Sequence, residues 1–215
     1  MDDSRRLILP PPYDQHATPG DVLAQAVARA ETDGAGALVW RHVPGRLDFA
    51  VVLEPDDALH LSRRAFVAGM VALAEALAAH CPPEHAVKLR WPDEVRFDLG
   101  RLGGARLIVA PGTEEQDIPA WLVFAVDLIA DRDHLDAPGA FPHSVSLKEA
   151  GFSDPPAIVE SFAAHLMLQF DRWKHDGFDS VAARYRARLD GDADLSLLAQ
   201  ALNPARWRDE GGPIL

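Results

Sequence analysis

Cysteine, tyrosine and methionine are scarce in this chain of 215 residues, which contains one Cys, two Tyr and three Met. The single cysteine, Cys81, excludes a disulfide within the chain and is typical of a reducing compartment, so we expect a cytoplasmic protein. Basic residues are also few, because 21 Lys and Arg face 33 Asp and Glu and give a formal net charge of −12. Nucleic-acid binding requires clustered Lys and Arg, and their scatter here predicts no nucleic-acid partner.

Long apolar runs and common catalytic motifs are missing as well. The longest apolar run, Trp121–Val126, is far shorter than the roughly 20 residues that cross a bilayer, and the acidic start of the chain precedes no signal-peptide core. We therefore expect no membrane association. The chain has no G-x-x-x-x-G-K-[ST] phosphate loop, no G-x-S-x-G nucleophile elbow and no H-E-x-x-H zinc helix. Generic motifs therefore indicate no reaction.

The composition is that of a globular protein, with 48% hydrophobic and 25% charged residues. Three prolines make residues 7–13 an extended arm, and a surface loop is expected over 131–146. The remaining pattern predicts five helices and six strands. The helices are expected over 18–31 (capped by Thr18), 57–80, 156–174, 178–189 and 194–202, and the strands over 36–40, 47–53, 87–91, 95–97, 104–110 and 121–130. In the second helix, Phe66, Met70, Leu73 and Leu77 form one apolar stripe that we assign to the core.

Because strands and helices do not alternate strictly, the order predicts an α+β fold: a mixed, largely antiparallel sheet with packed helices. An exposed edge of such a sheet is consistent with a homodimer.

One segment carries a recognisable pattern. Residues 88–95 (K-L-R-W-P-D-E-V) and 100–107 (G-R-L-G-G-A-R-L) resemble, without a gap, the K-W-P-N-D and K-L-[AG]-G-I-L motifs of biotin protein ligases, which are related to lipoate ligases and octanoyl transferases. Trp91 and Pro92 match this motif outright, and Arg90 occupies the position of the lysine with which K-W-P-N-D begins. Arg101 stands where the family has its catalytic lysine.

Further segments extend the resemblance to residues 18–190. Residues 44–50, followed by Glu54-Pro55, resemble the P-x-G-N-L-x-x-S segment, residues 146–151 resemble T-L-x-E-x-G, and the last two long helices resemble the family's closing pair. The resemblance implies a ligase-like α+β domain over 18–190. An extended arm (1–17) precedes it, and a short helix with a tail (191–215) follows it.

The resemblance also implies a function. Family members form an acyl-adenylate from ATP and biotin or lipoate, with Mg²⁺, and transfer the acyl group to a lysine of a carrier-domain protein. The catalytic residue implied here is Arg101, and the implied ligand-binding residues are Gly45, Lys88, Arg90, Trp91, Pro92, Asp93, Glu94, Gly103 and Gly104. Asp93 and Glu94 replace the Asn and Asp of the motif. Three roles are open for this acidic pair: it holds Mg²⁺, it orients basic groups, or it forms a solvated turn. Arg106 lies along the ligand or on the surface.

Departures from the family predict a degenerate active site. The G-R-G-R-x-G loop that closes over the acyl-adenylate is missing, since Trp40 to Val43 runs directly into Pro44. The G-I-G-I-N strand is replaced by the bulkier residues 124–128, and no hydroxyl residue stands near Ala50. The expected function is a divergent ligase or acyltransferase, with biotin favoured over lipoate. The alternative is a non-catalytic binding module that kept the fold and lost the closing loop.

Overall fold

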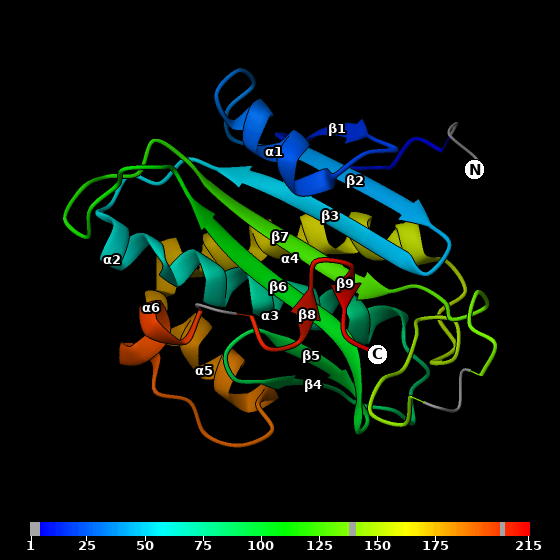
Figure 1. Cartoon of the computed structure of the whole chain (residues 1–215). Helices are drawn as coiled ribbons and strands as arrows, with labels where there is room; N and C mark the ends of the chain where they lie inside the picture. Colours follow the sequence, from blue (N-terminus) through cyan, green and yellow to red (C-terminus); the bar gives the residue numbers. More distant parts are fainter. Residues whose placement is uncertain (1–4, 138–140, 203–204) are drawn as a thin grey trace.

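A seven-stranded sheet forms the centre of the computed structural model, which describes residues 5–137, 141–202 and 205–215 (Figure 1). The strand order is β1-β2-β3-β7-β6-β5-β4, in which β1 and β2 are parallel and all other neighbours are antiparallel. The mixed, largely antiparallel sheet and the α+β class are therefore confirmed. The strands are β1 (Asp14–Ala17), β2 (Ala37–Val43), β3 (Arg46–Leu53), β4 (Val87–Arg90), β5 (Glu94–Phe97), β6 (Gly100–Val109) and β7 (Leu122–Ile129).

Three helices cover one face of this sheet: α3 (Arg64–His80), α4 (Pro155–Asp176) and α5 (Phe178–Arg188) (Figure 1). The expected stripe of α3 is buried, but so are most of its other residues, because α3 packs against the sheet, α4 and α5 together. Gly69 lets this helix approach closely, since a Cβ there would collide with the ring of Phe124. The predicted helix over 57–80 is divided, because α2 (Leu59–Ser62) ends at Arg63 before α3 begins.

The opposite face is covered at one end by α1 (Val22–Ala30), which buries apolar residues of β2, β3 and β7. The Asp21 carboxylate caps this helix and accepts from the Ala24 amide at 2.8 Å. The prediction of Thr18 as the cap was wrong, because its hydroxyl accepts from Gly20 instead and lies before the first turn. An aspartate beside the free amides also satisfies the positive end of the helix better than a hydroxyl does.

Short elements follow α5. Where one helix was expected over 194–202, a 3₁₀ turn, η2 (Leu195–Leu197), leads into the single-turn α6 (Leu198–Ala201). Residues expected to form a tail contain a hairpin of β8 (Arg208–Asp209) and β9 (Gly212–Pro213), which lies in front of β6 and β7 (Figure 1). Strand β1 was also not predicted, since its four residues show no apolar alternation. No helix in the described ranges is long and apolar enough to cross a membrane.

Candidate ligand-binding site

A row of residues, most of them charged, crosses six strands on the same sheet face as α1, in the part of that face that α1 does not cover. Each member is the register partner of the next, and register partners project to the same face of a sheet. We call this set the polar row: Arg41 on β2, Asp48 on β3, Asp127 on β7, Gly104 on β6, Glu94 on β5 and Arg90 on β4. The glycine in the middle leaves a gap between charged side chains.

Two members of the polar row, Asp48 and Asp127, are carboxylates only 3% and 2% exposed. Arg106 and Arg208 lie 3.3 and 3.1 Å from Asp127, and Arg46 forms an ion pair with the same carboxylate. Charged groups this deeply buried are rare unless they are paired. The pairing keeps Asp127 compatible with a strand that is otherwise apolar.

Asp48 is paired in the same way, with the Arg41 guanidinium at 2.6 Å and the Arg46 guanidinium at 3.3 Å. Burial raises the pKa of Asp48, and the hydrogen bond from Arg41 opposes this rise. We call Arg41, Arg46, Arg106 and Arg208 the arginine cluster. Its four positive charges meet two buried negative charges, so two positive charges are not neutralised within the network.

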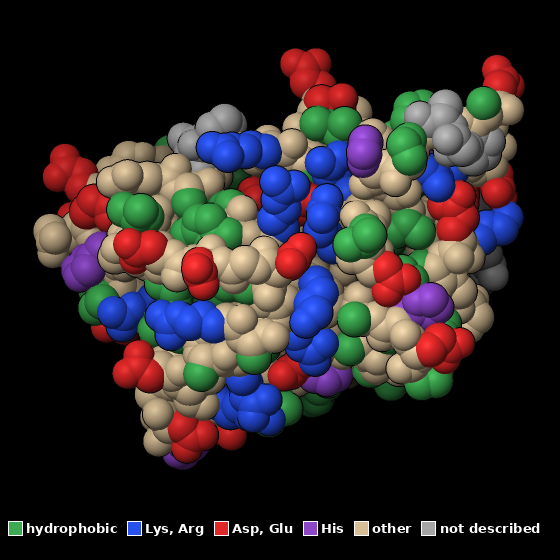
Figure 2. All heavy atoms as spheres, turned by 90° about the horizontal axis from the view of Figure 1, so that it is seen from below, with side chains coloured by type: hydrophobic (Ala, Val, Ile, Leu, Met, Phe, Trp, Pro, Cys, Tyr) green, Lys and Arg blue, Asp and Glu red, His purple; other side chains and the backbone are tan. Residues whose placement is uncertain are grey.

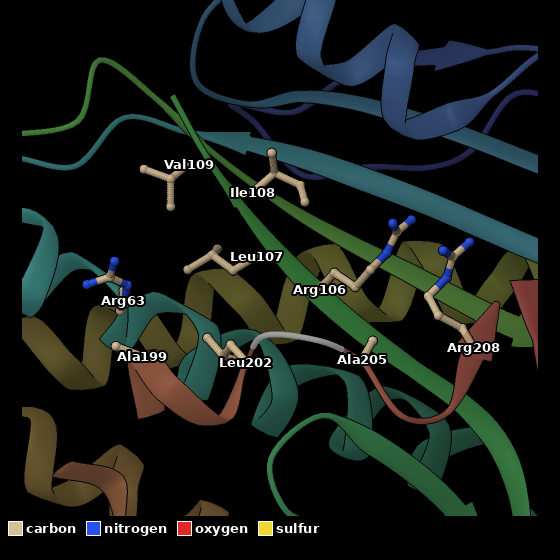
Figure 3. Close-up of a pocket in the computed structure, with 9 residues that line it drawn as sticks. All are labelled: Arg63, Arg106, Leu107, Ile108, Val109, Ala199, Leu202, Ala205 and Arg208. Atoms are coloured by element: carbon tan, nitrogen blue, oxygen red, sulfur yellow. The ribbon is translucent and has the colours of Figure 1, made fainter. Parts of the chain in front are cut away.

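The arginine cluster borders two cavities. A cavity of about 230 Å³ lies between the start of α1 and the polar row, and Asp21 and Glu210 at its rim are both exposed. A neighbouring cavity of about 540 Å³ shares Arg106 and Arg208 and extends along β6 to Arg63. Figure 3 shows the guanidinium groups of Arg106 and Arg208 side by side and pointing the same way. Burial lowers the pKa of Arg106, and the nearby Arg208 and Arg46 lower it further.

The surface also carries local positive charge. Figure 2 shows Lys and Arg side chains gathered in a band across the face seen from below, although the net charge of the chain is −12. Lys88 and Arg90 are exposed on β4, where they alternate with the buried Val87 and Leu89 as the sequence predicted. The overall charge therefore does not describe every face of the protein.

Arg101, the predicted catalytic residue, lies at the start of β6 and is tied to its neighbours. Its Nη1 donates to the Ile214 carbonyl at 3.1 Å, and its Nε lies 3.6 Å from a Glu94 carboxylate oxygen. Glu94 also accepts from Arg96 at 2.9 Å. Of the three roles considered for the acidic pair, Glu94 therefore orients basic groups.

Asp93 and Glu94 are 4% and 6% exposed, so the solvated-turn interpretation of this pair was wrong. Asp93 lies in the turn between β4 and β5, and its carbonyl accepts from the Ala105 amide of β6. Burial raises the pKa of Asp93 to about 6, although the neighbouring Trp207 side chain pulls this pKa down. No group of three His, Cys, Asp or Glu side chains suited to a metal occurs in the part of the chain that the structure describes. That Asp93 and Glu94 hold Mg²⁺ stays a prediction.

Other predicted binding residues lie elsewhere. Trp91 packs edge-on against Tyr185 of α5, and the Tyr185 hydroxyl donates to the Pro92 carbonyl at 2.6 Å. Gly45 forms the β2–β3 turn with a φ of 81°, and its amide donates to Asp131. The structure thus brings Arg90, Glu94, Arg101 and Gly104 to the polar face. Gly103 faces the core beside Val95 and Leu128, and Trp91, Pro92 and Gly45 make other contacts.

Gly103 and Gly104 are required by close packing. A Cβ on Gly103 would collide with the Asp127 carbonyl, and one on Gly104 would collide with the Asp93 carbonyl and lie 2.6 Å from the Trp207 ring. Trp207 is fully buried on top of Gly104. Sequence reasoning did not find Trp207, because its importance depends on where residues 205–215 fold.

Sequence reasoning also missed Arg41, Arg46, Asp48, Asp127 and Arg208. One signal was available, since Asp127 is the only charged residue within the apolar strand β7. A lone aspartate among apolar residues predicts a buried partner. The identity of that partner depends on strand order, which the pattern along one strand does not contain.

Comparison with known proteins places these features in context. The sequence model described as the biotin/lipoate A/B protein ligase family matches residues 9–187. A biotin protein ligase-like protein of unknown function from Silicibacter sp. TM1040 has a similar structure, with a TM-score of 0.78 and 25% identity over 89% of this chain and 86% of that one. No curated protein matches this sequence significantly.

Two biotin protein ligases share the fold at lower identity. The enzyme from Aquifex aeolicus has a TM-score of 0.59 and 14% identity, covering 77% of this chain and 72% of its own. The enzyme from Leishmania major, in complex with biotin, has a TM-score of 0.60 and 12% identity, covering 86% of this chain and 84% of its own.

Proposed function

Because the chain belongs to the biotin/lipoate A/B protein ligase family, we propose that it binds a small carboxylic acid such as biotin or lipoate, and its adenylate, on the face formed by β3, β7 and β6. The observation that carries this proposal is the arginine cluster beside the polar row. Two of its four positive charges are not neutralised by Asp48 and Asp127. A carboxylate or an α-phosphate supplies the missing negative charge through charge-assisted hydrogen bonds.

The proposed reaction has two steps. A carboxylate oxygen of the acid attacks the α-phosphorus of ATP and displaces pyrophosphate, which yields the acyl-adenylate. The amine of a carrier-protein lysine then attacks the acyl carbon and displaces AMP. The first step brings two negative groups together, and the second develops negative charge on the acyl oxygen and on the phosphate of the departing AMP, so fixed cations lower both barriers.

Arg101 and the arginine cluster supply these cations. A guanidinium remains protonated at neutral pH and offers a planar pair of donors, so Arg101 neutralises charge but transfers no proton. Magnesium, when it accompanies ATP, adds charge neutralisation at the phosphates.

A specific feature favours the second candidate, a binding module without catalysis. Val43 and Arg46 are register partners, so Pro44 and Gly45 alone connect β2 to β3 where the family resemblance implies a closing loop. Closing loops exclude water and retain reactive intermediates. A chain without that loop binds an adenylate but releases it to solvent, unless another segment covers the site.

Calorimetric titration tests the proposed binding. Biotin, lipoate, octanoate, ATP and non-hydrolysable acyl-adenylate analogues are titrated into the full chain, and we expect an adenylate analogue to bind more tightly than the bare acids. Arg106→Ala should weaken that binding by about tenfold to a hundredfold, since a charge-assisted contact contributes about 1.5–3 kcal/mol. Arg184→Ala is the matched control, because Arg184 lies on α5 and contacts Glu75 instead.

Absence of binding to every probe would refute the proposal. If an analogue binds, exchange of radiolabelled pyrophosphate into ATP separates the two candidates. Exchange that depends on the acid supports the ligase. Binding without exchange supports the non-catalytic module.

A further inference from the structure

Residues 205–215 place a large apolar ring on the proposed ligand face. Among the described residues, Trp207 has the largest fully buried side chain, although it belongs to a segment whose two strands contain two residues each. Its indole lies on Gly104, in the gap at the middle of the polar row. The gap therefore already contains a planar ring that comes from the chain itself.

The same segment supplies oxygen acceptors to the arginines of the site. The Gly211 carbonyl accepts from Arg46 and the Ile214 carbonyl accepts from Arg101, both at 3.1 Å. Arg208 of the segment lies 3.1 Å from Asp127. The ring and the two carbonyl oxygens thus occupy the positions that the ring and the oxygens of a ring-bearing anion would require. Neutral carbonyls are weaker partners for a guanidinium than charged oxygens are.

From this juxtaposition we propose that residues 205–215 act as an internal plug, which occupies the ligand face and must leave before an adenylate binds. The plug would regulate the site of the proposed function, so this inference rests on that proposal. When no ligand is present, the plug holds Arg46 and Arg101 through its carbonyl oxygens. Arg208 belongs to both the plug and the arginine cluster, so opening removes it and leaves Arg41, Arg46 and Arg106 facing Asp48 and Asp127, with one positive charge in excess for the ligand. A ligand that carries both a ring and an anion competes with it.

The attachment of the plug suits reversible opening. Strands β8 and β9 form a separate two-stranded sheet and do not pair with the seven-stranded sheet. Isolated hairpins of two strands are marginally stable, and local regions can open without global unfolding. Opening exposes one indole and breaks the side-chain contacts of Arg46, Arg101 and Arg208, while the backbone pairing of the large sheet stays intact.

Substitution of the ring tests the plug in the full chain. A non-hydrolysable biotinyl-adenylate analogue is titrated into the unmodified protein and into Trp207→Ala. Because a site covered for most of the time has a raised apparent Kd, we expect Trp207→Ala to lower the Kd by about tenfold or more. Trp173→Ala is the control, since Trp173 packs between Phe170 and Phe178 on the other face, and its Kd should equal that of the unmodified protein.

The outcomes separate the two proposals. Equal affinity of the unmodified protein and Trp207→Ala would overturn the plug and leave the proposed function intact. Absence of binding to all three proteins would overturn the proposed function, and the plug with it.

Hydrogen exchange on the unmodified protein provides a second test that does not depend on the variant folding. Amides of residues 207–214 should exchange about a hundredfold faster than those in the middle of β6 and β7, because the plug opens locally. A saturating concentration of the analogue should accelerate exchange in 207–214 and slow it in β6. Protection of residues 207–214 that is unchanged or increased by the bound analogue would overturn the plug.

Discussion

Replacing Asp127 by asparagine probes the network on which the proposed site depends. Asn has nearly the same shape, so the change removes charge without creating a cavity. Asp127 is 2% exposed and is contacted by Arg46, Arg106 and Arg208. The variant leaves four guanidinium groups facing one carboxylate, that of Asp48, and raises the excess from two positive charges to three.

The expected loss of stability follows from this geometry. Removing one partner of a fully buried ion pair costs about 3–5 kcal/mol, because the other charge is left without compensation. The side chains of Arg46 and Arg106 are each 22% exposed, so water screens part of this cost. We expect a loss of about 2–3 kcal/mol in the free energy of unfolding. For a chain of this size, the corresponding decrease in Tm is roughly 4–12 °C.

Urea unfolding at pH 7, followed by circular dichroism, measures this loss. Asp133→Asn is the control, because Asp133 pairs with Lys148 on the surface with both side chains more than 60% exposed, and such pairs contribute at most about 1 kcal/mol. Sulfate should restore more stability to Asp127→Asn than to the unmodified protein when compared with sodium chloride at equal ionic strength. A loss below about 1 kcal/mol for Asp127→Asn, or one equal to that of Asp133→Asn, would refute the argument that buried charge holds the site together.

Three further predictions concern single residues. Arg101→Ala should weaken binding of the adenylate analogue by about tenfold to a hundredfold in calorimetry with an unchanged circular dichroism spectrum, and unchanged affinity would assign Arg101 a purely structural role. Burial raises the pKa of Asp93 to about 6, so the native state binds its proton more tightly than the unfolded chain, whose carboxyl titrates near 3.8. The free energy of unfolding should therefore decrease as the pH rises from about 4 to 6. Asp93→Asn should remove this part of the pH dependence in urea titrations, and an identical pH profile would contradict the assignment. Gly69→Ala should destabilise the protein by about 1–3 kcal/mol, because its Cβ would collide with the Phe124 ring, and thermal unfolding with no loss would show that α3 can shift away from the sheet.

The local sequence determined most of the elements. Alternation of apolar and basic residues predicted β4, and the exposed Lys88 and Arg90 confirm it. Prolines and glycines fixed the C-terminal end of α3 and both ends of α4 to within a few residues of their observed positions. Short-range features sufficed here because periodicity and turn residues act over one or two turns of chain. The family resemblance of residues 88–107 was likewise readable from contiguous residues.

The tertiary structure alone decided what the site contains. The polar row joins residues from six strands, and its membership depends on strand order and register, which no single strand encodes. The burial of Trp207 depends on a hairpin whose residues show no apolar periodicity. The apolar stripe of α3 gave only the residues that face the sheet, because the packing of α4 and α5 on its other sides is a long-range event. The sequence by itself therefore determined the elements and the family, whereas the charges and the ring that meet on the ligand face depend on contacts between residues that are distant in the chain.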